Sequence, residues 1–419
     1  MSVVRFASKK ALLACGVVLT LSSAMGGAAA AGAEKTIYEF QNGRDGALPY
    51  AGLIADNAGN LYGTTFNGGG RSTCYYGRCG TVFRITPKGE ETILYAFTGR
   101  SDGDAPEGGL VADGSGNLYG TTLRGGSSDR GTVFRVTPGG KEATLYAFQG
   151  GSDGEYPAYT LLMDGNGDLF GTTVAGGSFN GTDCEDEGCG TVFELEPDGT
   201  KLTLYTFQGG NDGWSPTGAL IADQSGNLYG TTLEGGDTTC DGSPLDCGTV
   251  FRLAPDGTET LLHTFHGGSA DGSAPEGGVI ADAAGNLYGT TAIGGNCSVN
   301  IRGCGTVFRL APDGTETVLY DFQGGSDGVG PGAGLIMDKN GNLYGTTEFG
   351  GGAGCQKASD GCGTVFKLTP DGKETVLARF NRRNGAGPTA SLLLLKHTLY
   401  GTTYAGGDQK SGVVFSVKR

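Results

Sequence analysis

The sequence has few of the residues on which enzyme chemistry usually depends. Only three histidines occur in 419 residues. His263 and His266 have an H-x-x-H spacing in an expected outer strand, a weak metal signal, and His397 falls in an expected turn. There is no credible nucleophile elbow, phosphate-binding loop or dinucleotide fingerprint, since GxG matches carry no information in a glycine-rich chain. The common catalytic classes are therefore not indicated.

Positive charge and long apolar runs are also scarce. Lys and Arg total 29 against 44 Asp and Glu, which gives a formal net charge of −15. An acidic surface repels nucleic acid and anionic membranes, so we expect neither as a partner. Beyond the first 24 residues, no segment is long and apolar enough to be a membrane span.

The N-terminus has the pattern of a secretory signal. Arg5, Lys9 and Lys10 precede an apolar stretch at 11–24 and a small-residue run that includes Ala31-Gly32-Ala33. We therefore predict a signal peptide over 1–33 and a single secreted or periplasmic domain over 34–419, acting as a monomer. Removing the signal leaves a net charge of about −18. The residues before Cys15 also resemble a lipobox, so a lipid anchor at Cys15 is the alternative.

Glycine is abundant, at 83 residues, and it marks a repeat. No G-X-Y period exists, which excludes collagen. The word [LF][YF]-G-T-T begins at seven places with spacings of 51 to 59 residues: 61, 118, 169, 228, 287, 343 and 399. Periods of this size indicate a solenoid or a propeller.

Each repeat contains four strand-like words in a fixed order. In one repeat they are GVIAD (278–282), NLYGTT (286–291), GTVFRL (305–310) and ETVLYDF (316–322). Short turn-forming links join the first word to the second and the third to the fourth, as in antiparallel hairpins. The nearly continuous apolar residues predict burial on both faces, as stacked blades provide.

The two ends of the chain complete each other. The last repeat stops at its third word, GVVFSV (412–417), and a spare fourth word, KTIYEF (35–40), stands near the N-terminus. Pairing these two segments closes a ring and leaves no unpaired end blade. We therefore predict an all-β fold, a seven-bladed β-propeller of four-stranded antiparallel blades. A linear solenoid would instead need polar caps.

The repeated unit GVIADAAGNLYGTT…GTVFRLAPDGTETVLYDF resembles the GloVer tandem-repeat family of secreted bacterial proteins and, more distantly, NHL-type propeller repeats. The resemblance covers residues 35–417. It implies an extracellular setting and often a C-terminal surface anchor, although no sorting tail follows Lys418-Arg419 here. It implies no defined biochemical role.

Ten cysteines remain outside the signal, and they fall in five local pairs. Each pair lies between the second and third strand words of its repeat: Cys74–Cys79, Cys184–Cys189, Cys240–Cys247, Cys297–Cys304 and Cys355–Cys362. Metal sites favour C-x2–4-C pairs that meet in space, whereas these pairs belong to separate repeats. We predict five disulfides, each stiffening one loop of a secreted protein.

Strand parity places these stapled loops and the loops that cross to the next blade on one face of the ring. This loop face is the default binding face. The crossing loops share a DGxxP word whose acidic residues are Asp45, Asp102, Asp153, Asp212, Asp271 and Asp327, with Asn384 in the seventh. A ring of aspartates offers oxygen ligands for Ca²⁺, but Asp-Gly is also ordinary turn chemistry, which we favour.

Three aromatic residues on the loop face are candidates for ligand contact: Tyr76, Tyr156 and Trp214. The favoured function is a binding or scaffold module for an extracellular polysaccharide or protein. Glu107 and Glu276, each in a PEGG word just before a first strand, suggest an alternative. Across the channel mouth they would serve a divalent-metal-dependent lyase or lactonase-type hydrolase, although we favour the interpretation that they are two surface glutamates on an acidic protein.

Overall fold

The computed structural model describes residues 34–70, 79–177, 184, 188–236, 247–297, 303–352 and 362–419. Residues from Gly32 onward form one compact unit. The expected signal segment 1–33, with Cys15, lies outside the described residues. Cys74, Tyr76, Cys240 and Cys355 lie outside them as well.

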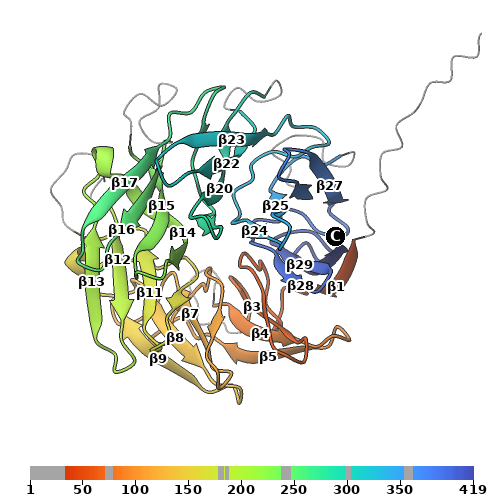
Figure 1. The fold of residues 1–419 in the computed structure, drawn as a ribbon. Helices are drawn as coiled ribbons and strands as arrows, with labels where there is room; N and C mark the ends of the chain where they lie inside the picture. The colour runs from red at the N-terminus through yellow and green to blue at the C-terminus, as the bar shows by residue number, and fades with distance from the viewer. Residues whose placement is uncertain are drawn as a thin grey trace, which may run out of the picture. The chain divides into compact units, whose positions relative to one another are not determined.

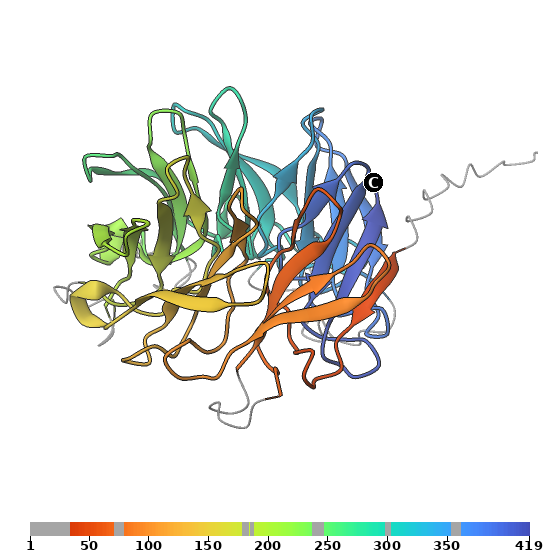
Figure 2. The same cartoon turned by 90° about the horizontal axis from the view of Figure 1, so that it is seen from below.

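The described chain forms seven four-stranded antiparallel sheets in a ring, which confirms the predicted seven-bladed β-propeller (Figure 1). Figure 2 shows the same ring from the side. A two-stranded sheet, β18 (Gly272–Ser273) and β21 (Ile293–Gly294), lies outside the blades. Two 3-10 turns, η2 (Gly151–Asp153) and η4 (Gly210–Asp212), lie in crossing loops.

The first six blades follow the chain in order, from the innermost strand to the outermost. Blade one is β2 (Ile54–Ala55), β3 (Leu61–Thr65), β4 (Thr81–Ile85) and β5 (Glu91–Ala96). Blade two is β6 (Val111–Ala112), β7 (Leu118–Thr122), β8 (Thr132–Val136) and β9 (Glu142–Ala147). Blade three is β10 (Leu162–Met163), β11 (Leu169–Thr173), β12 (Thr191–Leu195) and β13 (Lys201–Thr206).

The remaining three of these blades repeat the pattern. Blade four is β14 (Trp214–Ala222), β15 (Leu228–Glu234), β16 (Thr249–Leu253) and β17 (Glu259–Thr264). Blade five is β19 (Val279–Ala281), β20 (Leu287–Thr291), β22 (Thr306–Leu310) and β23 (Glu316–Asp321). Blade six is β24 (Ile336–Met337), β25 (Leu343–Thr347), β26 (Thr364–Leu368) and β27 (Glu374–Arg379).

Blade seven joins the two ends of the chain. It consists of β28 (Leu393–Leu395), β29 (Thr398–Thr403), β30 (Val413–Lys418) and, outermost, β1 (Lys35–Glu39). β1 pairs antiparallel with β30, with Lys35 opposite Ser416 and Glu39 opposite Val413. In Figure 1 the red N-terminal strand accordingly lies beside the blue C-terminal strands. The predicted ring closure is confirmed.

The middle strands of each blade carry the core. In β4 every residue except Arg84 is buried, whereas the residues of β5 are partly buried or exposed. The prediction of burial on both faces therefore holds for the second and third strands but is wrong for the fourth. The fourth strand has one neighbour in its sheet and lies at the outer rim of the ring, so its residues stay half-exposed.

Neighbouring blades meet through a repeated contact between two phenylalanines. The Phe that follows an outer strand packs edge-to-face on the Phe of the third strand in the next blade, as Phe97 does on Phe134 at 5.0 Å between centroids. Phe380 and Phe415 make the contact between blades six and seven at 4.9 Å. Phe40, which follows β1, makes it with Phe83 at 5.2 Å. The N-terminal strand therefore supplies the junction between blades seven and one.

The inner ends of the blades are joined by threonine hydroxyls. In five of the seven blades, the first Thr of the Gly-Thr-Thr word donates to a backbone carbonyl where the next blade begins. Thr64 Oγ1 donates to the Gly108 carbonyl at 3.1 Å, and Thr121 Oγ1 donates to the Tyr159 carbonyl at 3.2 Å. Thr402 Oγ1 donates to the Ala51 carbonyl at 2.9 Å, which closes the ring on the inner side as well.

Candidate functional site: a central cavity on the loop face

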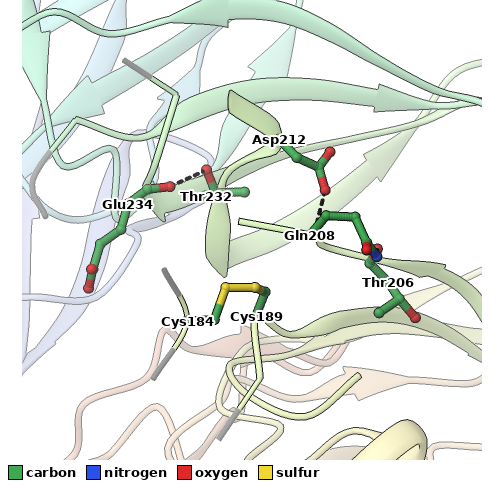
Figure 3. The surroundings of a disulfide bond; sticks show 7 residues. All are labelled: Cys184, Cys189, Thr206, Gln208, Asp212, Thr232 and Glu234. Carbon is green, nitrogen blue, oxygen red and sulfur yellow. Dashed lines mark hydrogen bonds between the residues drawn. A yellow bond between two sulfur atoms is a disulfide. The ribbon is translucent and has the colours of Figure 1, made fainter. Parts of the chain in front are cut away.

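The aspartates of the DGxxP words lie one in each of six crossing loops. Asp212 accepts a hydrogen bond from the Tyr205 hydroxyl at 2.7 Å and from the Gln208 backbone N–H at 2.6 Å, the latter drawn in Figure 3. Five of the six accept from the tyrosine seven residues earlier in this way: Asp45, Asp102, Asp153, Asp212 and Asp327. These carboxylates hold their own loops to the outer strands, in agreement with turn chemistry.

Blade four ends in a variation of this contact. His263 occupies the tyrosine position, and its Nε2 lies 3.7 Å from Asp271 Oδ2. The His266 backbone N–H donates to the same carboxylate at 2.8 Å. In the last crossing loop Asn384 replaces the aspartate and accepts from the Asn381 N–H at 2.9 Å. His397 stands apart, in the turn between β28 and β29.

Two of the predicted disulfides are confirmed within the described residues. Cys184–Cys189 and Cys297–Cys304 are bonded, and Figure 3 shows the first beneath the crossing loop of Asp212. Cys79, Cys247 and Cys362 are also disulfide-bonded, and their expected partners lie outside the described residues. Disulfides of this number indicate an oxidising compartment.

The stapled cysteines help to position the next blade. The residue before each crossing-loop proline has a positive φ, for example 57° at both Ala105 and Ala274. The Ala105 N–H donates to the Cys79 carbonyl at 3.3 Å, and the Ala274 N–H donates to the Cys247 carbonyl at 3.1 Å. Glu107 and Glu276 follow two residues later in the sequence. The staples therefore fix the backbone that presents these two glutamates.

The blades surround a cavity of about 490 Å³, which falls within the usual range for small-molecule sites. Glu107 and Glu276 both line it. Its other ionisable or aromatic lining residues are Tyr50, Tyr159, Glu348 and Tyr404, and small residues of the inner segments complete the wall. No lysine or arginine lines it in the described ranges.

Glu107 and Glu276 have no partner in the part of the protein that the structure describes. Among the described residues, neither carboxyl accepts a hydrogen bond or forms an ion pair. Glu276 is accessible to solvent because it projects into the cavity, yet protein encloses the group on most sides. This enclosure, with a smaller effect of the negative charge on Glu348, raises the pKa of Glu276 to about 7. Burial alone raises the pKa of Glu107.

Tyrosines connect the carboxyl groups around the cavity. Burial and the charges of Glu107 and Glu276 raise the pKa of Tyr159. Tyr404 donates its hydroxyl to Glu348 Oε1 at 3.2 Å and stacks on Tyr50 with ring centroids 5.2 Å apart. Burial and Glu348 raise the pKa of Tyr404 to about 12. Neutral phenols therefore coexist near pH 7 with a Glu276 carboxyl that is partly protonated.

Two of the three predicted loop aromatics, Tyr156 and Trp214, lie away from this lining, and Tyr76 lies outside the described residues. Tyr156 accepts a hydrogen bond from Arg130 Nη1 at 2.6 Å, and the Arg124 guanidinium lies 5.2 Å from its ring centroid. Trp214 opens β14 opposite Glu234 and packs against the cluster that contains Cys184 and Cys189. Both side chains remain partly exposed.

Four lining residues, Tyr50, Tyr159, Glu348 and Tyr404, were not predicted from the sequence. Three of them were signalled in the repeat alignment: Tyr50 follows a crossing-loop proline, and Glu348 and Tyr404 each follow the Thr-Thr of their blade. At these positions the repeats differ from one another, whereas the flanking words recur. At the position directly after the crossing-loop proline, the seven repeats have Tyr50, Glu107, Ala158, Thr217, Glu276, Gly332 and Thr389.

The search for metal sites and membrane helices gives two further observations. In the part of the chain that the structure describes, no three His, Cys, Asp or Glu side chains gather as a metal site would require. Within the same ranges, no helix has the length and hydrophobicity needed to cross a bilayer.

Comparison with known proteins identifies the repeat. The profile of the Gloeobacter/Verrucomicrobia repeat matches three overlapping segments, at 72–242, 181–358 and 237–419. No curated protein matches the sequence.

Solved structures show the same kind of fold at low identity. The extracellular domain of a hybrid two-component system from B. thetaiotaomicron is 10% identical with a TM-score of 0.56, covering 91% of this chain and 39% of that one. A candidate 6-phosphogluconolactonase from Bacteroides uniformis is 16% identical with a TM-score of 0.49, covering 77% and 84%. At these identities the similarity concerns the fold alone.

Proposed function

Because the chain belongs to the Gloeobacter/Verrucomicrobia repeat family and folds as a seven-bladed propeller, we propose that it is a binding module whose ligand occupies the central cavity. The observation that carries the proposal is the unpartnered state of Glu107 and Glu276 in a cavity of about 490 Å³. Enclosed carboxyls without partners gain most from a ligand that donates hydrogen bonds to them.

The favoured ligand is a segment of extracellular polysaccharide. Sugar hydroxyls donate to carboxylates, and the tyrosines offer flat amphipathic surfaces beside them. The disulfides and the expected signal segment support a secreted or periplasmic setting, where such polymers occur. The cavity opens on the loop face, so Tyr76, Tyr156 and Trp214 are candidates to contact a longer chain outside it.

A glycan array with two variants tests this proposal. One variant carries Glu107→Gln, Glu276→Gln and Tyr404→Ala in the cavity, and the other carries Tyr76→Ala, Tyr156→Ala and Trp214→Ala on the loops. We expect the cavity variant to bind at least about tenfold more weakly, since charge-assisted hydrogen bonds are lost. The loop variant should lose less affinity, and only for long chains.

Two results would contradict the proposal. Binding that survives both sets of substitutions would exclude the loop face, including its cavity, as the binding surface. Binding that is lost only in the loop variant would mean that the glycan docks on the loops and not in the cavity. Unchanged melting temperatures would show that each variant is folded.

A second candidate function is catalysis at the same place. A carboxyl with a pKa of about 7, as at Glu276, can both donate and accept a proton near neutral pH. A lyase or lactonase-type hydrolase would use Glu276 and Glu107 in this way, with a divalent cation held partly by the substrate. Turnover that is insensitive to chelation and to both Glu→Gln substitutions would eliminate this candidate.

A further inference from the structure

The central cavity has a strongly one-sided charge. Three carboxyl groups line it, those of Glu107, Glu276 and Glu348, and no lysine or arginine does so among the described residues. Glu348 has a protein partner, the Tyr404 hydroxyl at 3.2 Å. Glu107 and Glu276 have none. The cavity therefore offers acceptors and negative charge but no cationic donor.

A metal ion does not fit this arrangement well. One ion needs several oxygen ligands converging on a point, and no three acidic side chains gather in that way within the described ranges. The carboxyls instead line different parts of a space of about 490 Å³. They enter it from blades two, five and six, at Glu107, Glu276 and Glu348. An extended organic ligand can reach all of them.

The electrostatics distinguish a cationic ligand from a neutral one. Enclosure raises the pKa of Glu276, and the neighbouring Glu348 charge raises it further, so ionisation is penalised twice. A neutral sugar relieves the loss of solvation by donating hydrogen bonds. An ammonium group does that and also offsets the repulsion between the carboxylates. Tyr50 and Tyr404 add aromatic surface that attracts cations.

We infer that the cavity selects a ligand bearing an ammonium group, of the class of amino sugars with a free amine. This inference rests on the proposed binding function and specifies its ligand. In this arrangement the free amine faces Glu276 and Glu348, and the rest of the sugar lies along Tyr50 and Tyr404.

The test compares oligosaccharides that differ at one substituent. Calorimetry at pH 6.5 and low salt would use a β-1,4-glucosamine tetramer, its N-acetylated counterpart, and an N-trimethylated tetramer whose positive charge does not titrate. We expect both cationic tetramers to bind at least about tenfold more tightly than the N-acetylated one. Glu276→Gln and Glu348→Gln should each reduce that preference several-fold or more.

Glu91→Gln is the matched control. Glu91 lies at the outer rim, also has a pKa raised to about 7, and its substitution changes the net charge by the same unit. It should leave the preference unchanged, which separates a local contact from the general attraction of an acidic protein for cations. If Glu91→Gln and Glu276→Gln weaken binding equally, the inference is wrong.

The remaining outcomes distinguish a failure of this inference from a failure of the proposed binding function. If the N-acetylated tetramer binds as tightly as the free amine, and Glu276→Gln weakens both, the cavity binds neutral sugars and only the inference fails. It fails in the same way if no tetramer binds while another ligand depends on the cavity residues. If no ligand depends on those residues, the proposed function fails too.

Discussion

Gly190 shows how closely neighbouring blades approach at the level of single residues. It precedes β12 with φ of 95°, and a Cβ there would lie 2.5 Å from Pro216 Cδ in the next blade and 2.5 Å from the Thr173 carbonyl oxygen. Gly131 and Gly248 hold the same position in other blades, with the next proline as close. The many glycines of the chain include one such contact per blade.

We predict that Gly190→Ala destabilises the protein by about 1–3 kcal/mol, since backbone and proline must move apart and the φ is strained. Gly165→Ala is the control, because a Cβ there meets nothing within 4 Å. Denaturant melts of both variants would measure the difference. Equal stability of the two would contradict the tight fit described between blades.

At the same scale, the sequence predicted part of the candidate site. Glu107 and Glu276 were recognisable because the PEGG word places an acid just before the innermost strand. Tyr159 was not recognisable, and neither was the proximity of Glu348 to Glu276, because these residues become neighbours only when distant blades meet around the axis. A single repeat contains no information about which residues face each other across the ring.

At the scale of the element, the outer strands carry acidic contacts between blades. Glu91, Glu259, Glu316 and Glu374 each begin an outer strand, and burial and then a crossing-loop aspartate raise the pKa of each to about 7. The aspartates are Asp45, Asp212, Asp271 and Asp327. In blade three the residue that begins the outer strand is Lys201, whose Nζ lies 3.1 Å from Asp153 Oδ1.

These pairs predict a protein that is more stable in mild acid. A glutamate with a raised pKa in the folded state binds its proton more tightly there than in the unfolded chain, where its pKa is about 4.3. Its favourable contribution is fully present below that value and is lost as the pH rises through 7. We therefore expect the melting temperature to fall between pH 5 and pH 8.

The four rim glutamates supply the matched variant for this test. Glu91→Gln, Glu259→Gln, Glu316→Gln and Glu374→Gln together keep the neutral form at every pH and should flatten the decline. Asp338 does not interfere, because its hydrogen bonds, which outweigh the effect of partial burial, lower its pKa to about 2, outside this range. A melting temperature that rises from pH 5 to pH 8 in the parent protein would contradict the prediction.

The positions of the strands were predictable from the repeat, whereas the partial exposure of the outermost strand of each blade was not. The words around 286–291 and 305–310 became β20 and β22 within one residue at each end. The fourth-strand word predicted a buried strand, but its alternation of Glu, Thr and apolar residues serves a half-exposed rim. Periodicity reports which residues are apolar and does not report how many neighbours a strand has in its sheet.

At the scale of the whole molecule, the ring depends on eight residues at the N-terminus. β1 pairs with β30, and Phe40 provides the Phe83 contact that other blades obtain from their own outer strands. The closing junction is therefore built like the internal ones, although β1 and its partner strand β30 are more than three hundred residues apart in the sequence. The count of repeated words was sufficient to predict this closure.

We predict that deleting residues 34–41 lowers the melting temperature and promotes aggregation through the exposed edge of β30. Phe40→Ala should cost about 3–5 kcal/mol, and Phe97→Ala at an internal junction should cost a similar amount. Chemical unfolding and light scattering would compare the three proteins. A truncated protein that stays monomeric and melts like the parent would show that the termini do not close the ring.

The central claim is that a nearly uniform ring carries its ligand at a place where the repeats diverge, the cavity of Glu107, Glu276, Glu348 and Tyr404. A crystal structure of the complex with the tightest ligand from the array tests it most directly. We predict ligand density within the cavity, in contact with Glu276 and Tyr404. Density on the rim or the loops, with the cavity empty, would contradict the claim.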